Sequence, residues 1–319
     1  MQALILEQQD GKTLSSVQNI DANLLPPGDV TVDIHWSSLN YKDALAITGK
    51  GKIIRNFPMI PGIDFAGTVH ASEDPRFHVG QQVLLTGWGV GENHWGGLAE
   101  RARVKGEWLV SMPEGLDGRK AMAIGTAGFT AMLCVMALED AGVRPQDGEI
   151  VVTGASGGVG STAVALLHHL GYQVAAVSGR ESTHDYLKSL GAQRILGRDE
   201  FAESRPLEKQ IWAGAIDTVG DKVLAKVLAQ MNYGGCVAAC GLAGGFVMPF
   251  ILRNVRLQGV DSVMTPPARR AEAWCRLVRD LPESFYAQSA TEITLADAPT
   301  FADKIMNNQI QGRTLVKIG

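Results

Sequence analysis

The chain has few cysteines, few aromatic residues and no excess of basic charge. Its 319 residues include four cysteines, and aromatic residues make up 6% of the sequence. No two cysteines form a CxxC pair, and no histidine lies at ligand spacing from a cysteine, so the sequence supports neither a zinc site nor a disulfide framework. We therefore expect no metal, and free thiols at Cys134, Cys236, Cys240 and Cys275 in a reducing compartment.

The charge balance and the apolar patterning also exclude several classes of protein. There are 29 Lys and Arg residues against 33 Asp and Glu, a net charge of −4, whereas nucleic-acid binding needs a clustered positive field. The N-terminus lacks a basic segment followed by a long apolar one, so it is not a signal peptide. We see no run of about 18 apolar residues, as a membrane span would need. These observations predict a cytoplasmic protein with neither nucleic-acid nor membrane partners.

Glycine, by contrast, is abundant at 37 residues, and 45% of the chain is hydrophobic. The length suggests two domains at about 150 residues each. The first 118 residues contain short segments of two-residue apolar alternation, separated by Gly, Pro, Asn and Asp. The clearest are residues 30–36, 64–69 and 82–85. Several short strands without a helical repeat predict an antiparallel, barrel-like module.

Helical and extended segments alternate from residue 119 onward. Apolar residues at helical spacing occupy 119–140, and later helices are predicted at 161–170, 181–190 and 268–281. Strands are predicted between them at 149–153, 173–177, 215–219 and 235–239. This alternation is typical of βαβ units with a parallel sheet. The closing strand, 314–318, is more like the first module. We therefore predict an α/β protein with a catalytic barrel domain (1–118 and 265–319) and a Rossmann domain (119–264).

A glycine-rich loop follows the predicted strand 149–153. The Rossmann pattern G-x-G-x-x-G fits Ala155-x-Gly157-x-x-Gly160, with alanine in the first place. Such a loop needs a tight turn, bare backbone beside the pyrophosphate and close packing of helix on strand. The amides that open the next helix attract the diphosphate charge. A generic turn is the alternative, but a strand before and a helix after favour a dinucleotide site at Ser156, Gly157, Gly158, Val159 and Gly160.

The residues after the next strand favour NADPH over NADH. An acidic residue about twenty positions beyond the loop would accept the ribose 2′-hydroxyl of NAD. Here the sequence is Ser178-Gly179-Arg180, and a hydroxyl with a guanidinium suits a 2′-phosphate. Arg198 adds a second cation. A solvated surface charge at Arg180, with Glu181 facing the ribose, is the alternative.

The chain resembles the medium-chain dehydrogenase/reductases, and within them the zinc-free quinone oxidoreductase branch. Segments spread from end to end carry the resemblance: 40–43 (Asn-Tyr-Lys-Asp), 61–67 (Pro-Gly-Ile-Asp-Phe-Ala-Gly), 93–97 (Asn-His-Trp-Gly-Gly), 157–160, 190–192, 216–220 and 312–316. The resemblance implies a GroES-like barrel domain beside the Rossmann domain. It also implies a homodimer through the Rossmann edge strand, 257–263, because an unpaired apolar edge would otherwise aggregate.

Zinc-dependent relatives place a cysteine and a His-Glu pair where this chain has 37–41 (Ser-Ser-Leu-Asn-Tyr) and Ile63-Asp64. Without a Lewis acid, alcohol oxidation loses its main support. The resemblance implies instead reduction of a conjugated double bond, from acrylyl-CoA to propionyl-CoA. Hydride adds to the β-carbon, the thioester carbonyl spreads the charge, and a proton reaches the α-carbon. Quinone reduction and non-catalytic NADPH binding are the alternatives.

Tyr41 is the candidate proton donor, because a phenol stays protonated at pH 7. It would face the nicotinamide in a cleft between the domains; otherwise it only covers the cofactor and water supplies the proton. Asn40 and Asp64 would orient substrate, water or the ribose hydroxyls, although Asp64 would equally suit a turn-stabilising role. Further cofactor contacts are implied at Leu242, Ile251, Ser262 and Asn308.

Three cations lie within six residues, at Lys50, Lys52 and Arg55. They would attract the phosphates of CoA, although a solvated loop explains them as well. One departure from the family falls before 247–250 (Val-Met-Pro-Phe), where relatives have a few more residues. Either a deletion around 245–248 or a loop omitted from the sequence explains it.

Overall fold

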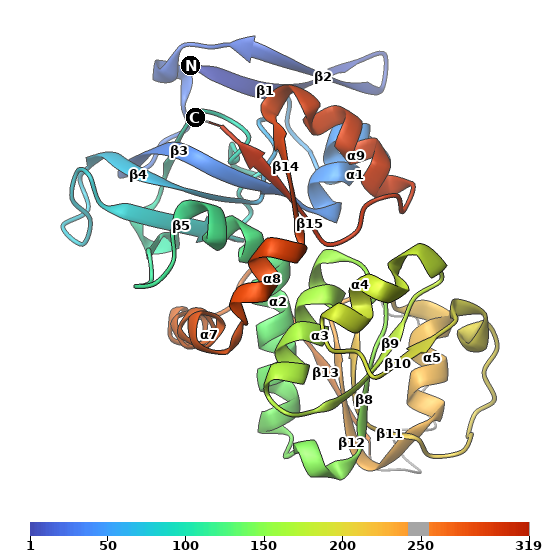
Figure 1. Ribbon diagram of the computed structural model, residues 1–319. Helices are drawn as coiled ribbons and strands as arrows, with labels where there is room; N and C mark the ends of the chain where they lie inside the picture. Colours follow the sequence, from blue (N-terminus) through green and yellow to red (C-terminus); the bar gives the residue numbers. More distant parts are fainter. Residues whose placement is uncertain (242–254, 319) are drawn as a thin grey trace. The chain divides into compact units, whose positions relative to one another are not determined.

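The chain folds into two units in the computed structural model, which describes residues 1–241 and 255–318 (Figure 1). The first unit comprises Met1–Thr126 and Ala290–Gly319, and the second comprises Ala127–Ser289. Each unit builds its own sheet and its own apolar core.

The first unit is built on a seven-stranded, mainly antiparallel sheet. Its strand order is β14-β15-β3-β4-β5-β7, with β6 also paired to β3. The early residues of β3 alternate between buried and half-buried positions, as predicted. Here the sequence located the strands well, because a half-buried strand carries a two-residue period. The strands are β3 (Val30–Leu39), β4 (Asp64–Ser72), β5 (Gln82–Thr86), β6 (Arg101–Val104), β7 (Val110–Ser111), β14 (Ala290–Thr294) and β15 (Arg313–Lys317).

The sequence analysis did not predict a hairpin and a helix of this unit. A hairpin of β1 (Gln2–Gln9) and β2 (Lys12–Asn19) opens the chain. Helix α1 (Tyr41–Thr48) packs against α9 (Ala298–Met306) (Figure 1). Helix α1 ends at Gly49, whose φ of 66° is the left-handed conformation usual after a helix. At eight residues, α1 is too short to show a clear helical period.

The closing strand belongs to the first unit, as predicted, because β15 pairs antiparallel with β3. The predicted boundary at residue 265 needs correction, however. Helices α7 (Pro267–Asp280) and α8 (Glu283–Gln288) fold with the second unit. Trp274 of α7 stacks on Phe129 of α2, and Arg276 pairs with Glu139. These contacts join positions far apart in sequence, which local patterns do not reveal.

The second unit is the predicted doubly wound parallel sheet. Its order is β10-β9-β8-β11-β12-β13, and every pair is parallel. The strands are β8 (Glu149–Val152), β9 (Gln173–Val177), β10 (Arg194–Leu196), β11 (Trp212–Asp217), β12 (Met231–Ala239) and β13 (Arg256–Gly259). The helices between them are α3 (Gly158–His169), α4 (His184–Ser189) and α5 (Asp221–Ala229). The predicted edge strand 257–263 is shorter than expected, because β13 ends at Gly259.

Helix α2 (Gly118–Asp140) corrects the expectation that no segment could span a membrane. By length and composition it passes that test, but 89% of its apolar window is buried inside the protein, as in a core helix. Gly125 interrupts it with φ 53° and ψ −159°, a conformation that essentially only glycine adopts. The division between the two units falls directly after this kink, at Thr126.

Candidate functional site

The glycine-rich loop lies between β8 and α3, as the dinucleotide motif requires. Gly154 has φ +58°, and a Cβ on Gly160 would lie 2.6 Å from Cα of Ala155, so the turn is tight and the helix packs closely on it. Gly157 is the N-cap of α3 and provides no side-chain cap. The amides at the start of α3 are therefore available to an anion such as a diphosphate.

A buried carboxylate fixes this loop to the neighbouring strand. Asp217, at the end of β11, accepts hydrogen bonds from Thr153 Oγ1 at 2.7 Å and from the Gly220 amide at 2.8 Å. Thr218 Oγ1 in turn donates to the Thr153 carbonyl at 2.9 Å. Burial raises the pKa of Asp217, and these hydrogen bonds oppose the shift. The ends of β8 and β11 are thereby held together where the loop begins.

The residues predicted to select NADPH gather beside the same loop. Arg180 NH2 donates to Ser156 Oγ at 3.0 Å, and the side chain of Arg198 packs over Gly179, with its Cβ 3.2 Å from where a glycine Cβ would stand. Burial lowers the pKa of the Arg180 guanidinium. A half-buried cation beside a second arginine and a hydroxyl suits a phosphate group.

Ser178 also holds the turn that follows β9, and its contact with the cofactor stays a prediction. Its Oγ lies 2.8 Å from Thr183 Oγ1, and Thr183 Oγ1 donates to the Arg180 carbonyl at 2.7 Å. Because the Thr183 proton goes to that carbonyl, Ser178 donates its own proton to Thr183. Ser178 therefore holds the 178–183 turn, and Ser156 is the hydroxyl directly hydrogen-bonded to Arg180. The sequence analysis missed Thr183, which is buried and carries no motif.

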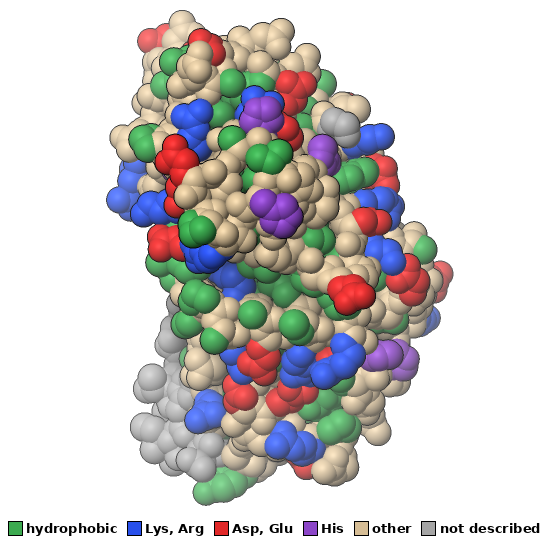
Figure 2. Space-filling model, turned by 90° about the vertical axis from the view of Figure 1, so that its left-hand side faces the viewer, with side chains coloured by type: hydrophobic (Ala, Val, Ile, Leu, Met, Phe, Trp, Pro, Cys, Tyr) green, Lys and Arg blue, Asp and Glu red, His purple; other side chains and the backbone are tan. Residues whose placement is uncertain are grey.

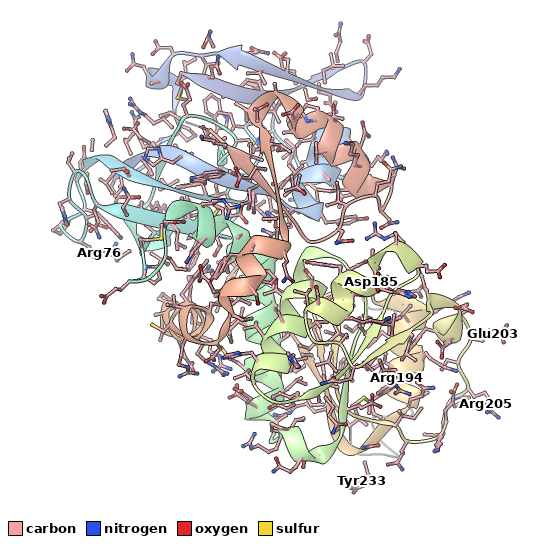
Figure 3. All side chains as sticks on the ribbon, viewed as in Figure 1. Arg76, Asp185, Arg194, Glu203, Arg205 and Tyr233 are labelled. Atoms are coloured by element: carbon pink, nitrogen blue, oxygen red, sulfur yellow. The ribbon has the colours of Figure 1, made fainter. Side chains whose placement is uncertain are left out.

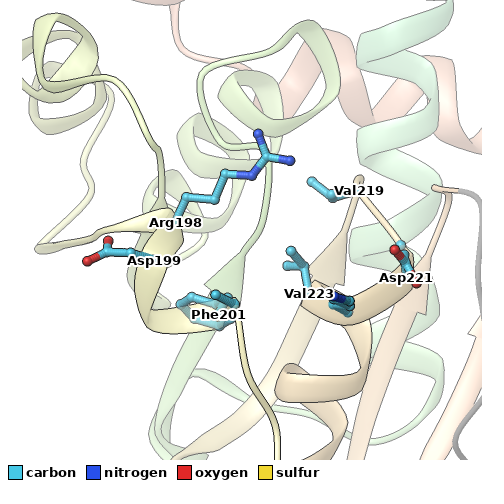
Figure 4. Close-up of a pocket in the computed structure, with 9 residues that line it drawn as sticks. Arg198, Asp199, Phe201, Val219, Asp221 and Val223 are labelled. Atoms are coloured by element: carbon cyan, nitrogen blue, oxygen red, sulfur yellow. The ribbon is translucent and has the colours of Figure 1, made fainter.

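A cavity of about 450 Å³ lies next to Arg198, between the 3₁₀ turn η5 (Arg198–Phe201) and the start of α5 (Figure 4). Phe201, Val219 and Val223 give it apolar walls, and Arg198 lies at its rim. Asp221, also lining it, has a φ of 51°. A partly apolar slot beside an arginine has the chemistry to take the adenine of a dinucleotide.

In the first unit, Asp64 and Asn40 belong to one buried network. Asp64 is fully buried and accepts from the Ser38 amide and hydroxyl at 3.1 and 2.7 Å. It also accepts from Asn40 Nδ2 at 3.0 Å and from the Thr126 amide at 2.8 Å. Both carboxylate oxygens are thus occupied. These contacts suit the structural role that the sequence analysis gave Asp64 as the alternative, and its contact with substrate or ribose stays a prediction.

A second buried carboxylate, Asp43, lies one turn into α1. It accepts from the amide of Asn40 at 2.8 Å and from those of Gly62 and Ile63 at 3.1 and 3.0 Å. Burial, and after it the charge of Asp64, raise the pKa of Asp43 to about 7. Asp43 ties the start of α1 to the segment that leads into β4. Its position three residues after Asn40 is a capping-box spacing, a signal that the sequence did offer.

Tyr41 is the first residue of α1 and is 59% exposed. The neighbouring Lys42 pairs with Glu92 at 2.8 Å and fixes this end of the helix to the 87–97 loop. The phenol is therefore accessible on a well-anchored backbone, as a proton donor needs to be.

The three predicted CoA-binding cations lie together in the loop after α1. Lys50 makes a long ion pair with Asp303 at 3.7 Å. Ile53, Ile54 and Phe57 of the same loop pack on the apolar core, while Lys50, Lys52 and Arg55 are exposed. The loop is thus anchored by its apolar residues and presents its cations to solvent.

The remaining predicted cofactor contacts belong to different units or lie outside the described residues. Asn308 follows α9 in the first unit with a φ of 54°, and the Ser262 carbonyl accepts from Arg270 in the second unit. Leu242, Ile251 and the 245–248 segment lie outside the described residues. Within residues 1–241 and 255–318, no group of three or more His, Cys, Asp or Glu side chains is placed to hold a metal ion.

A mainly antiparallel unit and a parallel-sheet unit with a dinucleotide loop define the class as a nucleotide-dependent dehydrogenase or reductase. Family comparison agrees: residues 26–114 match the alcohol dehydrogenase GroES-like domain, and residues 158–278 match the family described as zinc-binding dehydrogenase. The chain belongs to the medium-chain dehydrogenase/reductases, in the group of the acrylyl-CoA and quinone reductases.

The chain is 86% identical to the probable acrylyl-CoA reductase AcuI of Escherichia coli K12, over the full length of both chains. It is 54% identical to the acrylyl-CoA reductase AcuI of Ruegeria pomeroyi, covering 98% of this chain and 97% of that one. The alignment with the E. coli protein spans 323 positions, four more than this chain has residues, so this chain lacks at least four of them.

Solved structures of related oxidoreductases have the same fold as this chain. The yhdH oxidoreductase of Salmonella enterica in complex with NADP matches with a TM-score of 0.99 and 86% identity, covering all of both chains. The Bacillus subtilis protein yhfP with NAD bound matches with a TM-score of 0.94 and 42% identity, covering 99% of each chain.

Replacing Arg180 with alanine tests the cofactor preference. Because a guanidinium pairs much more strongly with a charged 2′-phosphate than with a neutral 2′-hydroxyl, we expect the variant to bind NADPH roughly 10- to 100-fold more weakly and its affinity for NADH to change little. Fluorescence titration of both cofactors measures this. Arg205→Ala, at an exposed arginine of the same unit (Figure 3), is the control and should leave both unchanged. Equal losses for both cofactors would contradict the assignment.

Asp43 gives stability a specific pH dependence. Its pKa rises from 3.8 to about 7 on folding, so between those values the folded state holds a proton that the unfolded state has released. The free energy of unfolding should therefore fall as pH rises from about 4 to about 7, and this contribution should level off above 7. Urea titrations across this range measure it. The slope should become shallower in Asp43→Asn, because the raised pKa of Asp217 still contributes to it, and should be unchanged in Asp185→Asn, an exposed carboxyl on α4 (Figure 3). An unchanged slope in Asp43→Asn would refute the assignment.

Proposed function

We propose that this protein reduces the conjugated double bond of acrylyl-CoA to give propionyl-CoA, using NADPH. The observation that carries the proposal is the 86% identity to a probable acrylyl-CoA reductase over the full length of both chains. A second relative named as an acrylyl-CoA reductase is 54% identical. At this level of identity the same substrate class is the simplest consequence.

NADPH fits the residues of the second unit. The open amides of α3 suit its diphosphate, Arg180, Arg198 and Ser156 suit the 2′-phosphate, and the cavity beside Arg198 suits the adenine. Structures 86% and 85% identical to this chain were solved with NADP and NADPH. When bound, the cofactor supplies the hydride.

Tyr41 supplies the proton in this proposal. Its phenol is exposed at the start of α1, and a tyrosine hydroxyl is a hydrogen-bond and proton donor. The product needs one proton at the α-carbon, and Tyr41 Oη would donate that proton. Lys50, Lys52 and Arg55 attract the phosphates of CoA, since their loop turns all three toward solvent.

Quinone reduction is the second candidate. A putative quinone oxidoreductase of B. subtilis, YhfP, is 44% identical over 99% of this chain, and the pig quinone oxidoreductase is 28% identical over 76% of it. Both are more distant than the acrylyl-CoA reductases. A quinone also has no use for the cationic loop.

A homodimer in the cytoplasm completes the proposal. Among residues 1–241 and 255–318, strand β13 is the last in the order of the parallel sheet, and its four residues are exposed, which suits pairing with a second copy. The four cysteines are free thiols, as suits a reducing compartment. Lysine and arginine lie among aspartate and glutamate over the face drawn in Figure 2, which forms no continuous basic stripe there. This supports the expectation that nucleic acid is not a partner.

The function is tested by following NADPH oxidation at about 340 nm with acrylyl-CoA, crotonyl-CoA and benzoquinone in parallel, repeated with NADH. We expect saturable turnover with acrylyl-CoA and NADPH that exceeds the quinone rate by at least tenfold. Turnover of quinones alone would refute the CoA proposal and leave the cofactor site intact.

Tyr41→Phe tests the proton donor. Loss of a general acid costs roughly 100-fold or more in kcat, while NADPH affinity should stay near that of the unaltered protein because the 2′-phosphate and diphosphate contacts remain. Steady-state rates and cofactor titration separate the two. Unchanged turnover would assign the proton to water.

The dimer is tested at the edge strand. Leu257 lies on β13 and is 38% exposed. We expect the Leu257→Glu variant to be monomeric, because a charge at the sheet edge opposes strand pairing. Leu24→Glu, at a 63% exposed position of the first unit, is the control. Multi-angle light scattering gives the mass, and an unaltered protein that is already monomeric would end the proposal.

A further inference from the structure

Arg313, on β15, is a buried cation that neither the sequence analysis nor the proposed function uses. Its side chain is 2% exposed, and it donates from Nε to the Ala123 carbonyl at 3.1 Å and from NH2 to Ser38 Oγ at 2.8 Å. It also donates from NH1 to Asn40 Oδ1 at 3.4 Å. A buried guanidinium is costly unless an opposite charge compensates it, and here the compensating carboxylate is Asp64.

Two polar side chains connect the charges. Ser38 Oγ accepts from Arg313 and donates to Asp64 Oδ1 at 2.7 Å. Asn40 accepts from Arg313 at Oδ1 and donates from Nδ2 to Asp64 Oδ2 at 3.0 Å. Arg313 and Asp64 thus form a pair bridged twice, once through a hydroxyl and once through an amide.

This bridge gives the Asn40 amide a single orientation. If the amide turned over, its N–H groups would face the guanidinium and its oxygen would face the carboxylate, so both contacts would become repulsive. With an uncharged residue in place of Arg313, only the contact with Asp64 would still favour one orientation of the Asn40 side-chain amide over the other. The orientation of Asn40 therefore depends on Arg313.

Gly125 leaves the room that this arrangement needs. A Cβ there would collide with NH2 of Arg313 and lie 2.8 Å from Ser38 Oγ. The glycine also has φ 53°, so the kink in α2 places a residue without a side chain against the guanidinium. The kink in α2 therefore lies where the buried guanidinium of Arg313 needs space.

We propose that Arg313 is a positioning residue for the reduction: through Asn40 it fixes the start of α1 and hence the direction of the Tyr41 phenol. Asn40 directly precedes Tyr41, and the backbone N–H of Asn40 donates to the Asp43 carboxylate at 2.8 Å. Asn40 is therefore fixed at its backbone by one buried carboxylate and at its side chain by Arg313 and Asp64. This inference rests on the proposed function, because it assigns Tyr41 the role of acid.

The test compares Arg313→Gln and Arg313→Lys with Lys317→Gln, at an exposed residue of the same strand. A misplaced catalytic group costs roughly 100-fold, so Arg313→Gln should lower kcat for acrylyl-CoA by about that factor. Its Kd for NADPH should stay within about twofold, since the phosphate-contact candidates Ser156, Arg180 and Arg198 lie in the other unit. Arg313→Lys keeps the charge and should recover part of kcat, and Lys317→Gln should match the unaltered protein.

A double variant separates positioning from general stability. If Arg313 acts through Asn40, Asn40→Ala together with Arg313→Gln should be no more than about twofold slower than the slower single variant. Losses that multiply, or a folded Arg313→Gln with unaltered kcat, would overturn the proposal. If Arg313→Gln fails to fold, Ser38→Ala removes one bridge only and should lower kcat with NADPH affinity kept; an unchanged kcat there would also overturn it.

The two hypotheses fail differently. An unaltered protein without acrylyl-CoA turnover contradicts the proposed function. An active protein whose kcat does not depend on Arg313 contradicts only the positioning role.

Discussion

The first unit depends on one fully buried carboxylate. Asp64 accepts four hydrogen bonds, from Ser38, Asn40 and Thr126, and with Arg313 it connects segments that are up to 275 positions apart in the chain. Removing either charge would leave the other uncompensated in the interior, which costs several kcal/mol. The arrangement of β3, β4, α2 and β15 around Asp64 is therefore tied to the position of the residues that begin α1.

The second unit uses a buried carboxylate in a comparable way. Asp217 holds the ends of β8 and β11 through Thr153 and Gly220, at the carboxyl edge of the sheet where a parallel fold binds its ligand. The glycine-rich loop starts from that fixed point. Its own residues lack side chains for anchoring, so neighbouring polar groups hold it while its amides stay available.

Charge placement also separates the two proposed binding sites, one for NADPH and one for the phosphates of CoA. Arg180 and Arg198 lie beside the nucleotide loop and are held by Ser156 and by packing on Gly179. Lys50, Lys52 and Arg55 lie on an exposed loop of the other unit. A half-buried arginine selects a phosphate by geometry, whereas exposed lysines attract one through a field that salt screens.

The sequence by itself determined the class of fold, the dinucleotide loop and the preference for NADPH, because each depends on local chemistry. A strand has a two-residue period, a tight phosphate-binding turn requires glycine, and an acid at the 2′ position is either present or absent. Tertiary structure alone decided that Asp64 is enclosed, that Ser178 gives its proton to Thr183, and that α7 and α8 belong with the second unit. Arg313 was visible in the sequence as a lone arginine before a strand. It becomes part of the site only because folding places it against Ser38 and Asn40, and no local pattern encodes a contact across that distance.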